Sequence, residues 1–272
     1  MKLQYSIIFI IVVVSSIIST TALASPSDNF YKENGEIFDD WDICRTRGTQ
    51  QDGFFQYLSK RDFRPVIAFE SLGGNADKAF QLGQGFIADY SDPTQRAEQI
   101  FNYVRNKIRY SSDQEQFGFP DFAQNADELI ETISVEGLTY GDCEDYAILL
   151  AIMFKGAGLR SAIALVPNHA GALVHLPGYV RANRLISLDD ESGWVWAEAT
   201  GRKNRLGWMP EQFIMDPVIA YEVTAETITA PEQPRKLPTV VIQKGGNRGF
   251  QAFPLFGVFL LMWLIPIFLR RH

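Results

Sequence analysis

The chain contains few of the residues from which nucleophilic sites are built. Only two cysteines, Cys44 and Cys143, and three histidines, His169, His175 and His272, occur among its 272 residues. A cysteine nucleophile needs a base within hydrogen-bonding reach. The scarcity of both residue types therefore leaves few nucleophile–base pairs to consider.

Other absences limit what the protein binds and how it is exported. The sequence has no Asn-x-Ser/Thr motif, so nothing indicates a glycosylating secretory pathway. Basic residues are outnumbered by acidic ones, 25 to 32, which gives a formal net charge of −7. This balance argues against a nucleic-acid-binding surface. The sequence also lacks internal repeats and low-complexity tracts.

Both ends of the chain have the pattern of targeting or membrane segments. Residues 1–24 combine an early lysine, an apolar run and a final Ala-Leu-Ala, which predicts a signal peptide cleaved after Ala24. Residues 250–269 are apolar and uncharged, and such a stretch can cross a bilayer core of roughly 30 Å. Residues 270–272 would then be a cytoplasmic tail. The alternatives are an uncleaved N-terminal anchor and a C-terminal sorting tail that is removed.

The region between these ends is expected to lie at the cell membrane, on its extracytoplasmic side. Residues 89–224 are predicted to form the main domain, preceded by an N-terminal extension, residues 25–88, in which we expect only scattered helix. Prolines and glycines interrupt residues 225–249. We therefore expect a stalk there, between the domain and the lipid bilayer.

Within the domain, helices are expected first and strands afterwards. Asp92-Pro93 combines an N-cap with a proline suited to the first turn, and apolar residues recur at helical spacing up to Ile108. Residues 126–134 predict a second, shorter helix. Short apolar runs then predict strands at residues 161–166, 169–176, 184–188 and 194–200. This order predicts an α+β fold with an antiparallel sheet.

The most informative segment of the chain is Gly141-Asp142-Cys143-Glu144-Asp145. It leads into the apolar residues 147–154, which predict a buried helix with Cys143 in its first turn. Unsatisfied backbone N–H groups at a helix N-terminus favour the thiolate, which is the reactive form of cysteine. The charges of Glu144 and Asp145 oppose this effect, because they raise the pKa of the thiol. We expect Asp142 to cap the helix.

His169 is the favoured base for Cys143. His272 lies beyond the predicted membrane segment. His169 and His175 belong to one predicted strand and are too far apart for both to reach the cysteine. His169 stands at the start of the strand, where small residues leave room around it. We expect His175 to be partly buried near the strand end.

Glu198 is the predicted acid that orients the base. Period-two alternation places it on the same face of its strand as Trp194 and Trp196. Leaving a carboxylate unpaired beside two indoles is energetically costly, so we predict that it pairs with His169. The alternatives are exposure at the sheet edge or an ion pair with Arg202 or Arg205.

Two other interpretations compete with a cysteine–histidine site. A disulfide between Cys44 and Cys143 would suit an exported protein. The run Asp189-Asp190-Glu191 could bind a cation, but adjacent carboxylates point in different directions, so a hairpin turn is favoured. The chemistry expected of the site requires no metal and no organic cofactor.

Together these motifs resemble the transglutaminase-like superfamily, papain-type enzymes with the order cysteine, histidine, acid. The membrane-attached prokaryotic branch is the most similar, and the resemblance covers about residues 93–213. Four segments carry it: a leading helix at 95–110, the cysteine motif at 141–145, a histidine strand from 167–170 and an acid strand from 197–201.

The resemblance implies a nucleophilic Cys143, a general acid/base His169 and an orienting Glu198. It also implies a papain- or transglutaminase-like core, in which the helix that bears the cysteine packs on the antiparallel sheet that carries the other two residues. Cys44 would then be a free, buried thiol. Many relatives have Asp in place of Glu198. No indole donor for an oxyanion hole is found upstream of Cys143, whose own backbone N–H should supply one donor.

The expected function is membrane-anchored, extracytoplasmic acyl transfer on protein or peptide amides. Cys143 would attack the amide carbonyl and His169 would protonate the leaving amine, giving a thioester that water or an amine then releases. Hydrolysis, as in a peptidase or amidase, is favoured over transamidation. The alternative is a non-catalytic transglutaminase-like ectodomain that serves as a binding module at the cell surface.

Overall fold

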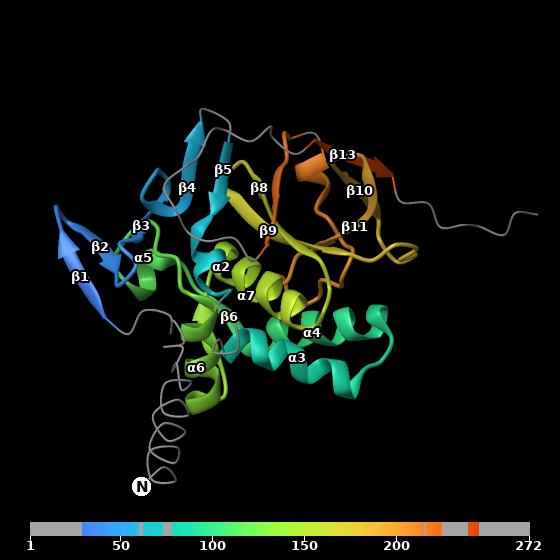
Figure 1. Ribbon diagram of the computed structural model, residues 1–272, viewed down its shortest axis with the longest axis horizontal. Helices are drawn as coiled ribbons and strands as arrows, with labels where there is room; N and C mark the ends of the chain where they lie inside the picture. Colours follow the sequence, from blue (N-terminus) through green and yellow to red (C-terminus); the bar gives the residue numbers. More distant parts are fainter. Residues whose placement is uncertain (1–28, 60–61, 73–77, 215, 225–238, 245–272) are drawn as a thin grey trace, which may run out of the picture.

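The computed structural model describes residues 29–59, 62–72, 78–214, 216–224 and 239–244 (Figure 1). Within these ranges the chain combines helices with largely antiparallel sheets, which confirms the predicted mixture of α and β structure. The predicted signal peptide, membrane segment and tail (residues 1–24, 250–269 and 270–272) lie outside the described residues. Among the helices that are described, none has both the length and the apolar character needed to span a bilayer.

A six-stranded antiparallel sheet forms the centre of the molecule. Its strand order is β12-β8-β9-β11-β10-β13, so β9 lies between β8 and β11. The register places Ala197 of β11 opposite Ala172 of β9. The strands are β8 (Ser161–Val166), β9 (His169–His175), β10 (Arg184–Leu188), β11 (Glu191–Ala197), β12 (Ile219–Glu222) and β13 (Val240–Lys244).

Two tight turns fix the pairing of these strands. Asn168 joins β8 to β9 with a φ of 55°, and Asp189 and Asp190 join β10 to β11 with φ values of 50° and 64°. Positive φ at successive residues is what a two-residue hairpin turn requires. The acidic run that begins at Asp189 is therefore a hairpin turn, as the sequence favoured.

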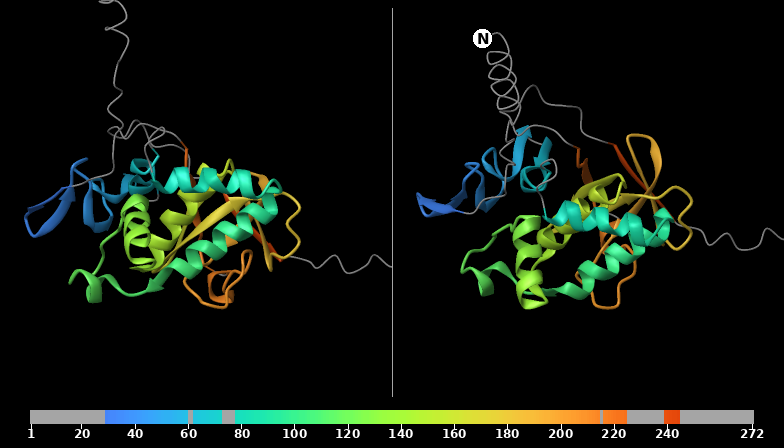
Figure 2. Two further views of the ribbon diagram at one scale, coloured as in Figure 1. Left: turned by 90° about the horizontal axis from the view of Figure 1, so that it is seen from below. Right: turned by 60° about the horizontal axis from the view of Figure 1, so that its bottom comes forward.

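Helix α7 (Cys143–Gly156) lies between the six-stranded sheet and two other helices, α3 (Lys78–Asp89) and α4 (Pro93–Lys107) (Figures 1 and 2). Its residues are buried almost throughout, as the apolar run predicted. Glycines bring α3 and α7 into backbone contact: a Cβ at Gly83 would overlap the carbonyl of Met153, and one at Gly156 would overlap the carbonyl of Phe80. The core is thus built around the helix that carries the cysteine.

The two helices predicted from their caps are present. Asp92 accepts a hydrogen bond from the backbone N–H of Gln95 at 2.7 Å and starts α4. Helix α6 (Ala126–Glu136) begins with a capping box between Asn125 and Glu128 and ends at Gly137, whose φ is 83°. Local sequence therefore determined both ends of α6.

The N-terminal extension contains a second sheet, which corrects the expectation of only scattered helix. Strands β1 to β5 pair in chain order, and the short helix α2 (Val66–Glu70) follows them. Asn34-Gly35 forms the β1–β2 turn with φ values of 51° and 91°, a hairpin signal that the sequence does carry. The strands are β1 (Phe30–Glu33), β2 (Glu36–Asp39), β3 (Cys44–Thr49), β4 (Gly53–Ser59) and β5 (Asp62–Pro65).

Buried charge explains why the pattern of these strands was not recognised. Arg45 in β3 is completely buried and forms an ion pair with Asp39 at 2.7 Å. The same guanidinium bonds Glu128 of α6 at 3.0 Å and lies 3.6 Å from Glu70 of α2. Polar residues at core positions hide the alternation on which strand prediction depends. Arg45 thereby attaches the N-terminal sheet to the helices.

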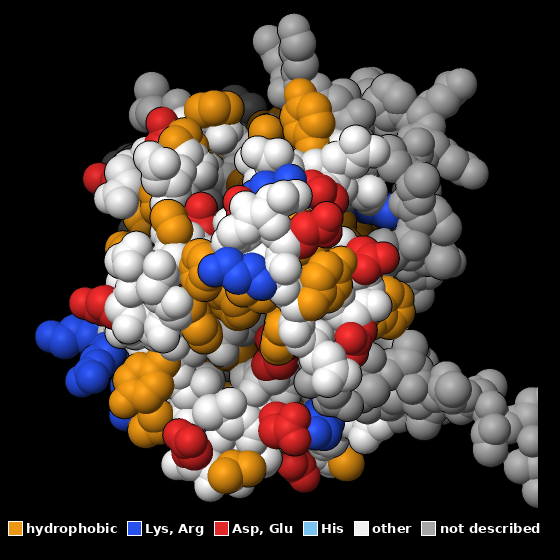
Figure 3. Space-filling view, turned by 90° about the vertical axis from the view of Figure 1, so that its left-hand side faces the viewer, with side chains coloured by type: hydrophobic (Ala, Val, Ile, Leu, Met, Phe, Trp, Pro, Cys, Tyr) orange, Lys and Arg blue, Asp and Glu red, His pale blue; other side chains and the backbone are white. Residues whose placement is uncertain are grey.

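Figure 3 shows the face of the molecule on the side of the N-terminal sheet, where hydrophobic side chains lie among acidic and basic ones. Aromatic residues of the N-terminal sheet and its turns contribute to the exposed apolar surface. These residues are Phe30, Tyr31, Trp41 and Tyr57.

Two further boundaries differ from the prediction. Part of the expected stalk, Val240–Lys244, is strand β13, which pairs with β10 at the edge of the main sheet; the prolines and glycines around it concealed this short apolar run. The remaining stalk residues, 225–238 and 245–249, lie outside the described ranges. Strand β11 ends at Ala197 rather than Thr200, because Thr200 donates its backbone N–H to the Glu198 side chain.

Candidate active site

Cys143 is the first residue of α7, and Asp142 occupies the N-cap position. The Asp145 carboxylate accepts the backbone N–H of Asp142 at 3.2 Å, which holds the first turn. The thiol, which is partly exposed, donates a hydrogen bond to Glu144 Oε2 at 3.3 Å. The backbone of Ala170 lies close enough to the sulfur to lower the pKa of the thiol. The cysteine therefore lies against the start of β9.

His169 and Glu198 are in direct contact. His169 is the first residue of β9, and Glu198 follows the last residue of the adjacent strand β11. The His169 Nε2 atom lies 2.5 Å from Glu198 Oε2, with side chains that are 17% and 4% exposed. His169 is thus the partner of Glu198, as the sequence predicted. Neither Arg202 nor Arg205 is paired with this carboxylate.

A third residue completes the hydrogen bonding of the acid. The hydroxyl of Thr200 and its backbone N–H both donate to Glu198 Oε1. Both carboxylate oxygens are therefore engaged, one by His169 and the other by Thr200. Burial alone would raise the pKa of Glu198, but His169 and Thr200 outweigh it and lower that pKa below its ordinary value. Glu198 is ionised at neutral pH.

The imidazole is also held by its ring face. Phe213, in the short 3-10 helix η1 (Glu211–Ile214), stacks on His169 with ring centroids 4.9 Å apart and planes inclined by 16°. Trp196 packs against Phe213 with centroids 6.0 Å apart. Gly171 makes this arrangement possible, since a Cβ there would lie 2.5 Å from Trp196 Cζ2.

The structure brings the three predicted residues to one end of the α7–β9 contact, but only two of them are hydrogen-bonded to each other. His169 and Glu198 share a hydrogen bond, whereas Cys143 meets the backbone of Ala170, the next residue along β9. Among the described residues, no hydrogen bond joins the thiol to the imidazole, and His169 Nδ1 has no partner.

Several carboxylates lie near Cys143, in addition to its contact with the start of β9. Burial, followed by the charges of Glu144 and Asp142, raises the pKa of the Cys143 thiol well above its ordinary value. Burial, with a hydrogen bond to Asp142, also raises the pKa of Glu144 to about 11. Asp113, in α5 (Asp113–Gln116), has its pKa raised to about 7 by burial and by the charge of Asp142. The thiol is thus held in its neutral form, and the adjacent carboxylates oppose the thiolate in the direction expected from the sequence.

The same carboxylates are the groups in this part of the chain that could hold a metal ion. Ligand atoms of Asp113, Asp142 and Asp145 lie within 4.8 Å of one another, as do those of Asp142, Cys143 and Glu144. The all-carboxylate set has the oxygen ligands that hard cations prefer. Protonation also reduces the negative charge of these carboxylates, because the pKa values of Glu144 and Asp113 are raised.

The competing interpretations of the sequence are not supported by the structure. Both cysteines are free, and Cys44 is buried in β3, where Arg47 Nε donates to its sulfur at 3.3 Å. His175 lies at the other end of β9 from His169, and its Nε2 contacts the carbonyl of Ser192 at 3.0 Å. Glu191 of the acidic run is paired with Arg160 at 2.7 Å.

Three residues of the site were not singled out from sequence. Thr200 lies in the segment that resembles the acid strand, residues 197–201. The sequence therefore placed it near Glu198 but did not show that it bonds the carboxylate. Asp113 and Phe213 carry no local signal, because each reaches the site from a distant part of the chain.

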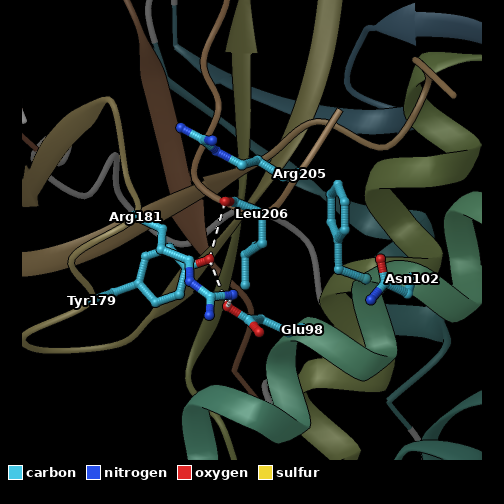
Figure 4. A pocket seen from close by; sticks show the side chains of 7 residues that line it. Glu98, Asn102, Tyr179, Arg181, Arg205 and Leu206 are labelled. Carbon is cyan, nitrogen blue, oxygen red and sulfur yellow. Dashed lines mark hydrogen bonds and ion pairs between the residues drawn. The ribbon is translucent and has the colours of Figure 1, made fainter. Parts of the chain in front are cut away.

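A small cavity of about 100 Å³ lies where α4 meets the loop that follows Glu198 (Figure 4). Tyr179 donates its hydroxyl to Glu98 of α4 at 3.0 Å and to the carbonyl of Leu206 at 3.1 Å. None of the three predicted catalytic residues lines it. These bonds anchor the far end of the loop that begins at Glu198.

A family model agrees with the resemblance found in the sequence. The model of the transglutaminase-like superfamily matches residues 81–212. A candidate cysteine protease from Cytophaga hutchinsonii has 14% identity and a TM-score of 0.32, covering 61% of this chain and 58% of that one. A candidate protease from Parabacteroides distasonis has 11% identity and a TM-score of 0.36, covering 76% and 42%. The chain thus spans less than two thirds of either relative, and no curated protein matches it.

Proposed function

We propose that this chain, whose residues 81–212 match the model of the transglutaminase-like superfamily, is a cysteine acyl-transfer enzyme. Cys143 would be the nucleophile, His169 the general acid/base and Glu198 the residue that orients the histidine. One observation carries the proposal: the 2.5 Å contact of His169 Nε2 with the ionised Glu198, beside the backbone that meets the Cys143 thiol. A base oriented by an acid next to a thiol is the arrangement that nucleophilic catalysis needs.

The first half of the reaction follows from the protonation states. The neutral Cys143 thiol gives its proton to His169 Nδ1 as the sulfur attacks the carbonyl carbon of an amide. Glu198 stabilises the resulting imidazolium through Nε2–H. The imidazolium then protonates the amine that leaves as the C–N bond breaks, and a thioester on Cys143 remains.

The second half of the reaction releases the acyl group. Water gives up a proton to His169 and attacks the thioester, the C–S bond breaks to release an acid, and the imidazolium returns the proton to the sulfur, which restores the thiol. An amine in place of water would give a new amide. We propose hydrolysis, as in a peptidase or amidase, as the principal outcome and protein or peptide amides as the substrates.

We also propose that the reaction takes place on the extracytoplasmic side of the cell membrane. The support is in the sequence alone: the signal-like residues 1–24 and the apolar residues 250–269 followed by two arginines. The lipid bilayer would then be a binding partner of residues 250–269. Protease protection of residues 270–272 in sealed vesicles, with the domain digested from outside, is the expected result.

A non-catalytic binding module is the second candidate. The observation in its favour is the hydrogen bond from the Cys143 thiol to Glu144, in surroundings that raise the pKa of the thiol. Such a thiol becomes reactive only after it transfers its proton to His169. A thiol that remains protonated is compatible with a protein that binds a partner without catalysing a reaction.

Turnover of a peptide library by the full chain in detergent tests the proposal. Wild-type protein should release new amino termini or ammonia, and mass spectrometry of the acid-quenched protein should find an acyl adduct on Cys143. The Cys143→Ser variant should lose both signals. Equal product formation by Cys143→Ser would rule out the cysteine mechanism, and no product or adduct with wild type would favour the binding module.

A further inference from the structure

The proposed reaction needs two hydrogen-bond donors for the oxyanion that forms on the carbonyl oxygen. The backbone N–H of Cys143, at the N-terminus of α7, is one of them. Gln124 is a nearby amide, but its Nε2 already donates to the carbonyl of Tyr140 and to Asp145 Oδ2, both at 2.9 Å. Gln124 is therefore committed to holding the helix start. The second donor must come from another residue.

Tyr110 lies beside the segment that leads into Cys143. It ends strand β6 (Ile108–Tyr110), which pairs in parallel with β7 (Thr139–Gly141) and places Tyr110 opposite Gly141. The backbone N–H of Ser111 donates to the Gly141 carbonyl at 3.1 Å and fixes this register. Neighbouring strands are about 4.8 Å apart, so the tyrosine stands next to the chain just before the nucleophile.

The Tyr110 side chain is available to a substrate. It is 60% exposed, and within the described ranges its hydroxyl has no hydrogen-bond partner. Buried tyrosines of this fold differ: Tyr146 donates to the carbonyl of Ile108 at 2.9 Å, and Tyr179 donates to Glu98. An exposed, uncommitted hydroxyl is what an oxyanion donor must offer before the substrate arrives.

The electrostatic surroundings favour the protonated phenol. Burial, and then the charges of Asp142, Cys143, Glu144 and Asp113, raise the pKa of Tyr110. Three of these groups, Asp142, Cys143 and Glu144, have side-chain atoms within 4.8 Å of one another. The raised pKa keeps the phenol protonated and able to donate.

We infer that Tyr110 is a further catalytic residue, whose hydroxyl donates the second hydrogen bond to the oxyanion formed when Cys143 attacks an amide. The inference rests on the proposed function. Tyr110 keeps its proton throughout, so the proton transfers through His169 are unchanged. A neutral donor suits a site in which several carboxylates already lie near the developing negative charge.

The test compares Tyr110→Phe with Tyr140→Phe in the full chain. Tyr140 is a matched control, because it is 50% exposed on the neighbouring strand β7 but stands opposite Arg109 rather than Gly141. Loss of one oxyanion donor lowers kcat by about 100-fold. We expect this loss for Tyr110→Phe with little change in KM, and a change of less than about twofold for Tyr140→Phe, within the ordinary effect of an exposed substitution.

Two further measurements, the alkylation rate of Cys143 and the melting temperature, make the outcome decisive. Alkylation of Cys143 by iodoacetamide forms no oxyanion, so Tyr110→Phe should be alkylated as fast as wild type and should melt at the same temperature. A Tyr110→Phe variant that retains wild-type kcat would overturn the inference and leave the proposed function intact. Wild type that neither turns over peptides nor is alkylated in a His169-dependent way would overturn the proposed function, and this inference with it.

Discussion

Thr200 occupies one oxygen of Glu198 so that the other is left for His169. Its hydroxyl and backbone N–H both bind Oε1, while His169 Nε2 lies 2.5 Å from Oε2. A carboxylate fixed at both oxygens cannot rotate away from the imidazole. The orientation of the proposed base therefore depends on a residue outside the predicted triad.

Replacing Thr200 with valine should weaken this positioning. A hydrogen bond to a charged group is worth about 1.5–3 kcal/mol, so we expect kcat to fall about tenfold or more. The acidic limb of the kcat profile should move to higher pH, because Glu198 loses a donor that lowers its pKa. Thr200→Ser should restore both values. A pH profile identical to that of wild type would contradict the positioning role.

Glu198 should make the folded protein more sensitive to acid. Its pKa is lower in the folded state than its ordinary value, so its stabilising contribution is complete above about pH 4.3, the unfolded value. That contribution is lost as the pH falls through the lower, folded value. Urea unfolding at several pH values should therefore show a component of acid destabilisation that Glu198→Gln lacks. Parallel curves for the two proteins would be evidence against the ion pair.

Asp113 should have the opposite effect on stability. Its pKa is raised to about 7 in the folded protein, so its contribution is complete below the unfolded value of about 3.9 and is lost as the pH rises to 7. Asp113→Asn should therefore raise the melting temperature at pH 8, by roughly 2–4 °C for each kcal/mol gained. The gain should disappear at pH 4. A lower melting temperature at both pH values would contradict the repulsion within the cluster.

Two glycines of helix α3 should respond to alanine in opposite ways. A Cβ at Gly83 would overlap the Met153 carbonyl, so Gly83→Ala should destabilise the fold by about 1–3 kcal/mol. Gly85 is exposed in the same helix with no atom near its Cβ position, and Gly85→Ala should stabilise the fold by about 0.5–1 kcal/mol. Chemical denaturation of both variants measures the difference. Equal effects would show that α3 and α7 are not packed through Gly83.

The sequence predicted those features whose signals are local. The helix caps, the apolar run of α7 and the hairpin turn at Asp189 each depend on neighbouring residues, and all three are present. The contact of His169 with Glu198 was predictable because each residue lies at the end of a short, regular strand. Adjacent strands bring such ends together.

The missed features depend on contacts between distant residues. The N-terminal sheet is held by the buried Arg45, which meets Glu70 and Glu128 from separate helices. Strand β13 owes its place to pairing with β10 and stands apart from the rest of the sheet in sequence. Asp113 and Phe213 likewise enter the site from remote segments. Hydropathy patterns contain no information on such contacts.

The most direct test of the central claim, that His169 activates Cys143, is the rate of iodoacetamide alkylation from pH 5 to 9 in the full chain. Peptide mass spectrometry would compare wild type with His169→Ala, His175→Ala and Glu198→Ala, with the buried Cys44 as an internal control. At neutral pH we expect His169→Ala to slow the alkylation of Cys143 by about 100-fold and Glu198→Ala to slow it as well, while His175→Ala leaves it unchanged. Equal rates in wild type and His169→Ala would contradict the account, and the chain should then be studied as a binding module.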